Sequence, residues 1–387
     1  METDTEYLLG RKEIILSREH IHNQIFNQKI LVTGAAGSIG RELVRQIISY
    51  NPSQLCLIDQ WELGIYELKS EFDTYPNIEF ELGNITDSTR MSAIFHDFKP
   101  QLVFHAAAYK HVSLLENHPR EAIKNNVIGT KIIADLSVQN HVEKFVFIST
   151  DKAVNPFSNM GVSKRMGELY VLSLNDDPQS ITQFIITRFG NVLGSTGSVY
   201  SIFKEQIEKG GPVTVTSPNA TRYFMSHFEA AQLVLEAAAI GKGAEILVFD
   251  MGLPILIYDL AKRMIELEKS TMAKNIRIVF TGLKNGEKLH ENLLFDEEKL
   301  LPTHHPKISI ARFETAHKTD IHLKIALLSE ALETATSDQL SSILKNILSE
   351  NKTAKTLYMQ PKFASNNVFA DNYSEIARSK CTYPPST

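Results

Sequence analysis

Short apolar runs alternate with amphipathic stretches along the first half of the chain. Lys29-Ile30-Leu31-Val32-Thr33 predicts a buried strand, and further strands are predicted at 55–58, 78–82, 102–105, 145–148 and 184–187. Between these runs apolar residues recur with the helical period, for example over 88–98 and 119–136. Strands that alternate with helices predict an α/β protein with a parallel, doubly wound sheet.

The pattern changes after about residue 191, where glycine, proline and serine become frequent. We therefore expect a smaller, substrate-binding lobe in the C-terminal half, interleaved with late sheet strands such as 247–251. The expected organisation is an N-terminal helical arm at 1–28, a nucleotide-binding domain at 29–191, the smaller lobe at 192–310, and a helical segment with a polar tail at 311–387. Helix is expected over 311–353, and the tail over 356–387 has no clear periodicity.

Composition excludes several classes of protein. Hydrophobic residues make up 43% and charged residues 22%, with a net charge of −5 and no long run of either sign, so no nucleic-acid partner is indicated. No apolar run is long enough for a membrane span, and the charged N-terminus excludes a secretory signal. The two cysteines form no CxxC motif, which favours a cytoplasmic protein. Among the 13 histidines only His304 and His305 are adjacent, without an HxxxH partner, so no metal site is expected.

A glycine-rich motif lies directly between the first predicted strand and helix. Gly34, Gly37 and Gly40 have the spacing GxxGxxG, and Ser38 and Ile39 lie where the helix begins. Glycine permits a tight turn and a close approach of backbone to a pyrophosphate, and the helix N-terminus supplies free N–H groups. These features predict a Rossmann-like dinucleotide site.

An acidic residue follows this motif at the end of the next predicted strand. Asp59 lies 19 residues after Gly40, where a carboxylate accepts hydrogen bonds from ribose hydroxyls and repels a 2′-phosphate. NAD is therefore favoured as the cofactor. Arg41 leaves NADP as the alternative, and an ordinary strand-end or capping role is the alternative for Asp59.

Thr150-Asp151-Lys152 follows the predicted strand at 145–148, and Met160-Gly161-Val162-Ser163-Lys164 comes shortly after. This region resembles the extended short-chain dehydrogenase/reductase superfamily, and more narrowly the UDP-N-acetylglucosamine 4,6-dehydratases of the CapD-like polysaccharide-biosynthesis family. The resemblance runs in order from residue 8 to residue 308. It is carried by LLGRKEIIL (8–16), TGAAGSIG (33–40), HAAAYKHV (105–112), STDKAVNP (149–156), MGVSKR (160–165), RFGNVLGS (188–195), GLKNGEKL (282–289) and LPTHHPKI (301–308).

The resemblance implies a dehydration in which bound NAD oxidises C4 of the sugar, water leaves across C5 and C6, and the hydride returns to C6. It implies that Lys152 removes the C5 proton, that Asp151 protonates the departing 6-hydroxyl, and that Thr150 is hydrogen-bonded to O4. Elimination next to a ketone requires such an acid and base on the same sugar. A simple ion pair in the loop is the alternative for Asp151 and Lys152.

Met160 departs from the Tyr-x-x-x-Lys pair that is usual in the superfamily. A thioether cannot exchange a proton, so another group must remove the proton of the C4 hydroxyl. Thr150, Asp151 and a water held by Lys164 stay open as that base. Similar members of the subgroup also carry Met at this position, and the resemblance places Lys164 at the nicotinamide ribose.

The resemblance also implies contacts at both ends of the site. Asn191 and Arg222 match positions that contact the UDP portion, and Glu287 matches one near the nucleotide ribose; an ordinary ion pair is the alternative for Arg222. The remaining expected contacts lie after predicted strands: Asn84 and Ile85 near the adenine, Ala106 and Ala107 near the cofactor, and Lys110 and His111 facing the cleft near cofactor and sugar.

The predicted function is thus a C5-retaining UDP-N-acetylglucosamine 4,6-dehydratase that makes precursors of surface polysaccharide. A C5-inverting dehydratase or a UDP-sugar epimerase is the alternative enzyme, and a non-catalytic NAD-binding regulator is the alternative outside enzymes. A homo-oligomer is expected. Many relatives carry membrane helices ahead of the LLGR segment, so both a soluble protein and a fragment of a longer one stay open.

Overall fold

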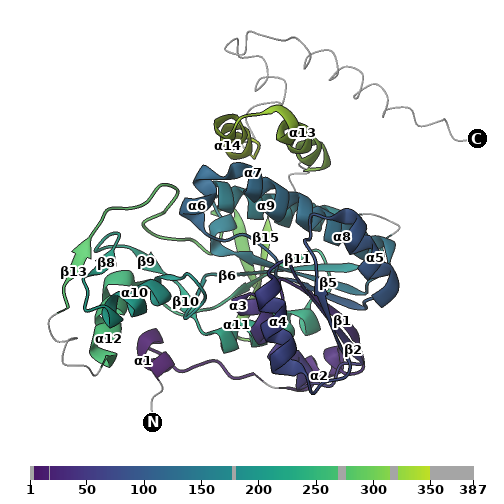
Figure 1. The fold of residues 1–387 in the computed structure, drawn as a ribbon, viewed down its shortest axis with the longest axis horizontal. Coiled ribbons are helices and arrows are strands. Elements are labelled where there is room, and N and C mark those ends of the chain that lie inside the picture. The colour runs from purple at the N-terminus through teal and green to yellow at the C-terminus, as the bar shows by residue number, and fades with distance from the viewer. Residues whose placement is uncertain (1–3, 17, 177–179, 269–275, 314–320, 349–387) are drawn as a thin grey trace, which may run out of the picture. The chain divides into compact units, whose positions relative to one another are not determined.

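The computed structural model describes residues 4–16, 18–176, 180–268, 276–313 and 321–348. These residues form a nine-stranded sheet in the order β14-β15-β11-β6-β5-β4-β1-β2-β3 (Figure 1). Its strands are β1 (Lys29–Thr33), β2 (Gln54–Asp59), β3 (Ile78–Leu82), β4 (Leu102–His105), β5 (Lys144–Thr150), β6 (Gln183–Phe189), β11 (Glu245–Phe249), β14 (Glu298–Pro302) and β15 (Ile308–Phe313).

From β3 to β11 in this order each strand is parallel to the next, and β15 is antiparallel to both of its neighbours, β11 and β14. The chain winds outward from β1 to β3 and then returns to the other side of β1 with β4. The prediction of a doubly wound, Rossmann-like sheet is therefore confirmed. In such a sheet the ligand site lies beyond the carboxyl ends of the strands where the winding reverses, here between β1 and β4.

Helices cover both faces of the sheet (Figure 1), which is why its central strands are continuous apolar runs and not alternating ones. On one face lie α2 (Glu19–Ile25), α3 (Ser38–Ile48), α4 (Glu62–Phe72) and α11 (His227–Ile240), with α11 packed on α2 and α3. On the other lie α5 (Ser88–Phe98), α8 (Thr130–Gln139) and α9 (Asn159–Ser173). Phe104, Phe145 and Phe147 are fully buried between these layers.

Shorter elements complete this part of the molecule. They are α6 (Val112–Asn117), α7 (Pro119–Glu121), the π-helix η1 (Ala122–Gly129), the 3₁₀ turns η2 (Asp151–Ala153) and η3 (Leu174–Asp176), and the helices α13 (Ile321–Thr334) and α14 (Ser337–Asn346). The π-helix is eight residues long and packs against α9, next to the expected site. π-Helical geometry is rare and occurs frequently at functional sites.

A second hydrophobic core lies outside the large sheet. Leu8 and Leu9 of the N-terminal helix pack there with Phe203, Val213 and Leu260. The elements around it are α1 (Asp4–Leu9), α10 (Val199–Glu208), α12 (Ile257–Leu267), β7 (Asn191–Val192), β8 (Val213–Val215), β9 (Thr221–Arg222), β10 (Phe224–Met225), β12 (Ile255–Leu256) and β13 (Ile278–Phe280).

Two expectations for the C-terminal half need correction. The late strand predicted at 247–251 begins and ends two residues earlier, at 245–249. Residues 311–313, predicted as helix, instead continue strand β15, because the edge of the sheet offers them hydrogen-bonding partners on β14. The predicted tail at 356–387 lies outside the described residues. Within the described ranges, no helix combines the length and the apolar character needed to cross a bilayer.

Candidate active site

The glycine-rich turn after β1 is shaped by contacts with the loop after β4. Gly34 has a φ of +68°, and a Cβ there would lie 2.5 Å from the backbone nitrogen of Ala107. A Cβ at Gly40 would lie 2.1 Å from the carbonyl oxygen of Gly34. Helix α3 begins after Gly37, whose missing side chain leaves the first N–H groups open to an anion.

A pocket of about 190 Å³ opens beside this turn. It collects six of the residues predicted for the cofactor, namely Gly34, Gly37, Asp59, Ile85, Ala106 and Ala107, together with Trp61, Tyr109 and Asn125. The pocket therefore lies at the carboxyl ends of β1, β2 and β4, as the topology requires. A larger hollow of about 780 Å³ between α5 and α8 contains none of the predicted site residues.

Asp59 is fixed in this pocket by two backbone hydrogen bonds. Its Oδ2 accepts from the N–H of Ala36 at 3.0 Å, and its Oδ1 accepts from the N–H of Trp61 at 3.0 Å. Each carboxylate oxygen can still accept another hydrogen bond, which suits recognition of a ribose hydroxyl. Arg41 donates to Glu67 at 2.8 Å, so its charge is balanced by helix α4. This pairing favours an unphosphorylated ribose.

Five predicted cofactor contacts do not line the pocket: Gly40 in the turn, Lys164 on α9, and Ser38, Ile39 and Asn84. Asn84 is exposed, and its Oδ1 accepts hydrogen bonds from the backbone and hydroxyl of Thr86, both at 2.9 Å. Ser38 is hydrogen-bonded to Thr196 of the smaller lobe. Ile39 is partly buried against the main core. Asn84 thus closes its own turn, and Ser38 connects the phosphate loop to the second lobe.

Thr150, Asp151 and Lys152 form a hydrogen-bonded chain at the carboxyl end of β5. Oδ1 of Asp151 accepts from the hydroxyl of Thr150 and from Nζ of Lys152, both at 2.9 Å. The carboxylate is fully buried, and its Oδ2 has no hydrogen-bond partner in the part of the chain that the structure describes. A buried acceptor with free capacity is where a substrate hydroxyl or a proton can bind. Asp151 and Lys152 thus do form an ion pair, and Oδ2 of Asp151 can still accept a hydrogen bond.

Helix α9 places Met160 and Lys164 next to this chain. Met160 is 2% exposed and packs against Leu115 and Ala122, so its contacts are those of a core residue. Nζ of Lys164 donates to the carbonyl of Ile148 at 2.7 Å and lies 3.9 Å from the ring centre of Phe147. Burial lowers the pKa of Lys164 to about 7, although Glu168 partly opposes the shift.

His105 is a buried neighbour of Lys164. Its two ring nitrogens are hydrogen-bonded to Thr33 at 2.7 Å and to Thr130 at 3.0 Å. Burial, with the charge of Lys164 as the smaller cause, lowers the pKa of His105 to about 3. The histidine is therefore neutral at physiological pH and connects β1, β4 and α8 behind the pocket.

The residues predicted for the sugar nucleotide are held mainly by one another. Asn191 accepts a hydrogen bond from Nζ of Lys152 at 2.9 Å, which places it directly beside the Thr150-Asp151-Lys152 chain. Arg222 is 6% exposed and donates to Glu287 at 3.0 Å and to the carbonyls of Thr221, Lys288 and Leu289. The guanidinium therefore holds the 287–289 loop in place.

Lys110 and His111 lie on the rim of the site. Both are exposed, and the ring of His111 packs so closely on Gly197 that a Cβ there would lie 2.6 Å from Cε1. Gly197 belongs to the loop that leads into the smaller lobe. The two side chains therefore lie at the junction between the loop after β4 and that lobe.

The structure adds residues that the sequence did not single out. Glu291 is 7% exposed, and its carboxylate lies 3.9 Å from Nζ of Lys152 and 3.3 Å from Nζ of Lys288. Lys288 also donates to the carbonyl of Val154 at 2.8 Å. The only hint in the sequence is that Glu291 comes two residues after the GLKNGEKL motif.

Asn126 of the π-helix supports the site from behind. Its side chain accepts from the N–H of Tyr109 at 2.8 Å and donates to the hydroxyl of Ser163 at 3.0 Å. The loop after β4 is thereby attached to helix α9, which carries Met160 and Lys164.

Comparison with known proteins agrees with this architecture. A family model described as polysaccharide biosynthesis protein matches residues 30–313. The chain is 46% identical over 326 residues to the capsular polysaccharide biosynthesis protein CapD of Staphylococcus aureus, covering 83% of this chain and 54% of that protein. It is 34% identical over 282 residues to UDP-N-acetylglucosamine 4,6-dehydratase (inverting) of Campylobacter jejuni, covering 72% and 80%.

Among solved structures, Pen from Bacillus thuringiensis superposes with a TM-score of 0.68 at 32% identity, covering 77% of this chain and 90% of that one. The dTDP-glucose 4,6-dehydratase DesIV from Streptomyces venezuelae shares the fold, with a TM-score of 0.62 at 21% identity over 68% of this chain and 87% of its own. The chain spans about half the length of CapD and of EpsC from Bacillus subtilis. The extent of these matches shows that the chain belongs to the polysaccharide biosynthesis protein family.

Proposed function

We propose that this chain is an NAD-dependent UDP-N-acetylglucosamine 4,6-dehydratase that forms a 4-keto-6-deoxy sugar nucleotide for polysaccharide synthesis. The observation that carries the proposal is the Thr150-Asp151-Lys152 chain at the carboxyl end of β5, on the same edge of the parallel sheet as the dinucleotide-type pocket. Two Campylobacter jejuni relatives are named as UDP-N-acetylglucosamine 4,6-dehydratases, which supports this substrate.

The pocket residues fit NAD. The steric exclusion of any Cβ at Gly34 leaves a backbone cradle for a diphosphate beside the N-terminus of α3, and Asp59 is fixed where ribose hydroxyls bind. When bound, NAD would accept the hydride from C4 of the sugar and return it to C6. DesIV and WbmH of Bordetella bronchiseptica were solved with NAD on the same fold.

The elimination needs one base and one acid on the same sugar, and Lys152 and Asp151 are 2.9 Å apart. Lys152 removes the proton from C5 once the neighbouring carbon is a ketone. Transfer of one proton from Nζ of Lys152 to Asp151 across their hydrogen bond would give the neutral amine and the carboxylic acid that the elimination requires. Asp151 then delivers this proton to the departing 6-hydroxyl, for which its unpartnered Oδ2 has free capacity. Asn191 and Glu291 orient the ammonium of Lys152 between turnovers.

Removal of the proton from the C4 hydroxyl is left to a group other than Met160. Thr150 and Asp151 are in the hydrogen-bonded chain, and Lys164, with its pKa lowered to about 7, can hold or exchange a proton near neutral pH through a water. Lys164 is also placed to bind the nicotinamide ribose.

The direct test is incubation of the purified chain with UDP-N-acetylglucosamine and catalytic NAD, without added reductant, followed by mass spectrometry. The proposal expects a product lighter by one water and no net change in NAD. Unchanged mass and an unchanged NMR spectrum of the sugar nucleotide, with NAD shown by calorimetry to bind, would favour the non-catalytic alternative.

A C5-inverting enzyme is the second candidate, because the two Campylobacter jejuni relatives are named as inverting dehydratases. Both enzymes lose water, so mass alone does not separate them. NMR of the product formed in deuterated water reports the configuration and deuterium content at C5. Three Rickettsia relatives are named as UDP-glucose 4-epimerases. An epimerase would instead give a product of unchanged mass.

A further inference from the structure

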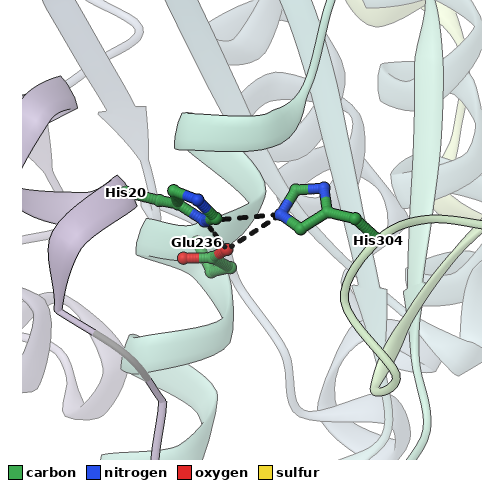
Figure 2. A group of neighbouring side chains, drawn as sticks. All are labelled: His20, Glu236 and His304. Carbon is green, nitrogen blue, oxygen red and sulfur yellow. Dashed lines mark hydrogen bonds and ion pairs between the residues drawn. The ribbon is translucent and has the colours of Figure 1, made fainter.

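Two histidines and a glutamate meet at a place that the proposed reaction does not use (Figure 2). His20 lies on α2 of the N-terminal arm, Glu236 on α11, and His304 in the loop between β14 and β15. His20 is 216 residues from Glu236 and 284 residues from His304 in the sequence. Only the fold brings these groups together, which is why the adjacent pair His304-His305 gave no sign of a metal site.

The three nearest atoms form a compact triangle. Nδ1 of His20 lies 3.1 Å from Oε1 of Glu236 and 3.3 Å from Nε2 of His304, and the third side, from His304 to Glu236, is 3.6 Å. Zinc bonds to imidazole nitrogen and carboxylate oxygen are about 2.0 to 2.2 Å, so neighbouring ligands of a tetrahedral ion lie about 3.3 to 3.6 Å apart. The distances between the three atoms are therefore close to the ligand spacing of a tetrahedral zinc site.

Protons alone satisfy this arrangement poorly. An N–H at Nδ1 of His20 can point at the carboxylate or at the second imidazole, but not well at both. In the tautomer that leaves Nε2 of His304 unprotonated, this nitrogen and the carboxylate oxygen then bring two lone pairs together. A cation at the centre of the triangle is attracted to all three atoms at once.

Burial also favours a cation. The side chain of Glu236 is 3% exposed, and its Oε2 has no hydrogen-bond partner among the residues the structure describes. A buried carboxylate with free acceptor capacity is costly unless a positive charge compensates it. The two histidine side chains are 52% and 55% exposed, so an ion reaches the site from solvent and keeps a water as its fourth ligand.

His305 is not part of the ligand set, because its Nδ1 accepts a hydrogen bond from the N–H of Lys307 at 3.1 Å. The donor set is therefore two imidazole nitrogens and one carboxylate, which suits zinc better than calcium or magnesium.

We propose that His20, Glu236 and His304 bind a zinc-class divalent metal ion that fastens helix α2 to α11 and to the β14–β15 hairpin. The site goes beyond the dehydratase proposal and does not depend on it. Its role is structural: the ion holds the N-terminal arm against the edge of the molecule where the sheet ends in its antiparallel hairpin.

The test is calorimetric titration of the chelator-treated and dialysed full chain with Zn²⁺ alone, alongside visible absorption with Co²⁺. The wild type should bind one ion more tightly than any other site on the chain and give a tetrahedral Co²⁺ spectrum. Affinity for that ion should fall by about 100-fold or more in His20→Ala and His304→Ala, since each removes one of three ligands. Both changes are at exposed side chains, so folding should be retained, as circular dichroism would check.

His22→Ala is the matched control, because His22 lies on the same helix, is exposed, and stacks on Phe26 away from the triangle. It should bind zinc like the wild type and show the same rise in melting temperature with zinc. Absence of stoichiometric binding in the wild type overturns the proposal. So does zinc binding by His20→Ala or His304→Ala that equals that of His22→Ala.

Discussion

The cofactor half and the sugar half of the candidate site are built in different ways. The cofactor half consists of backbone and small side chains at strand ends, with Gly34 packed against Ala107 and Asp59 fixed by two N–H groups. The sugar half consists of long charged side chains that satisfy one another, as Lys152 does with Asp151 and Arg222 does with Glu287. The cofactor half is held in place by its own backbone hydrogen bonds and close packing. The side chains of the sugar half must break some of their ion pairs with one another in order to bind the substrate.

The largest effect is expected from Lys152→Ala. Loss of the proposed base should lower turnover of UDP-N-acetylglucosamine by about 10²- to 10⁴-fold while NAD affinity stays unchanged, because Lys152 is not among the residues that line the cofactor pocket. Steady-state kinetics and calorimetry measure the two quantities. Lys209→Ala is the control, since Lys209 is exposed on α10. Retention of full turnover by Lys152→Ala would remove Lys152 from the mechanism.

Gly34→Ala should damage the cofactor half instead. The new Cβ meets the backbone of Ala107 at 2.5 Å and has to adopt a φ of +68°, so NAD should bind at least about tenfold more weakly and stability should fall by more than about 2 kcal/mol. Gly210→Ala separates the two causes, because Gly210 has a φ of +82° with no atom near its Cβ. Equal losses of NAD binding in both variants would argue against a steric cradle.

Glu287→Gln should show how far the sugar half depends on its internal pairs. The change weakens the contacts of Glu287 with Arg222 and Thr216, so the free energy of unfolding should fall by about 1 to 3 kcal/mol, and KM should rise more than kcat falls. Glu205→Gln is the control, because its partner Lys209 is largely exposed. A pure kcat effect would contradict a positioning role for this pair.

The last prediction concerns the pH dependence of stability. Lys164 takes up its proton below about 7 in the folded chain but near its ordinary value of 10.5 when unfolded, so between these values the unfolded chain binds more protons. Stability due to Lys164 should therefore rise with pH across this window, by at most about 1.4 kcal/mol per pH unit. Urea unfolding at several pH values should give a shallower slope for Lys164→Met. Identical slopes would mean that folding does not lower the pKa of Lys164.

Local patterns predicted the secondary structure around the cofactor pocket. The strand, glycine turn and helix over residues 29–48, and Asp59 at the next strand end, are short-range features whose geometry follows from the residues themselves. The parallel order of the sheet followed from the alternation of strands and helices. Helix over 311–313 was wrong because these residues pair with β14 in a hairpin, and Ala311 also pairs with the distant strand β11.

Long-range contacts explain what the sequence did not reveal. Glu291 approaches Lys152 from 139 residues away, and nothing in its own neighbourhood marks it as a partner. The same holds for the triangle of His20, Glu236 and His304, whose members come from three separate segments. Asn191 was nominated by resemblance for the UDP portion, and its hydrogen bond to Lys152 only became visible in the fold.

In the proposed reaction a hydride leaves C4 of the sugar and returns to C6 of the same molecule while water is lost. UDP-N-acetylglucosamine deuterated at C4 tests it directly, with the product analysed by mass spectrometry and NMR. We predict a product that has lost one water and carries the deuterium at C6. Deuterium that stays at C4, or that is lost to solvent, would contradict the proposed transfer of hydride from C4 to C6.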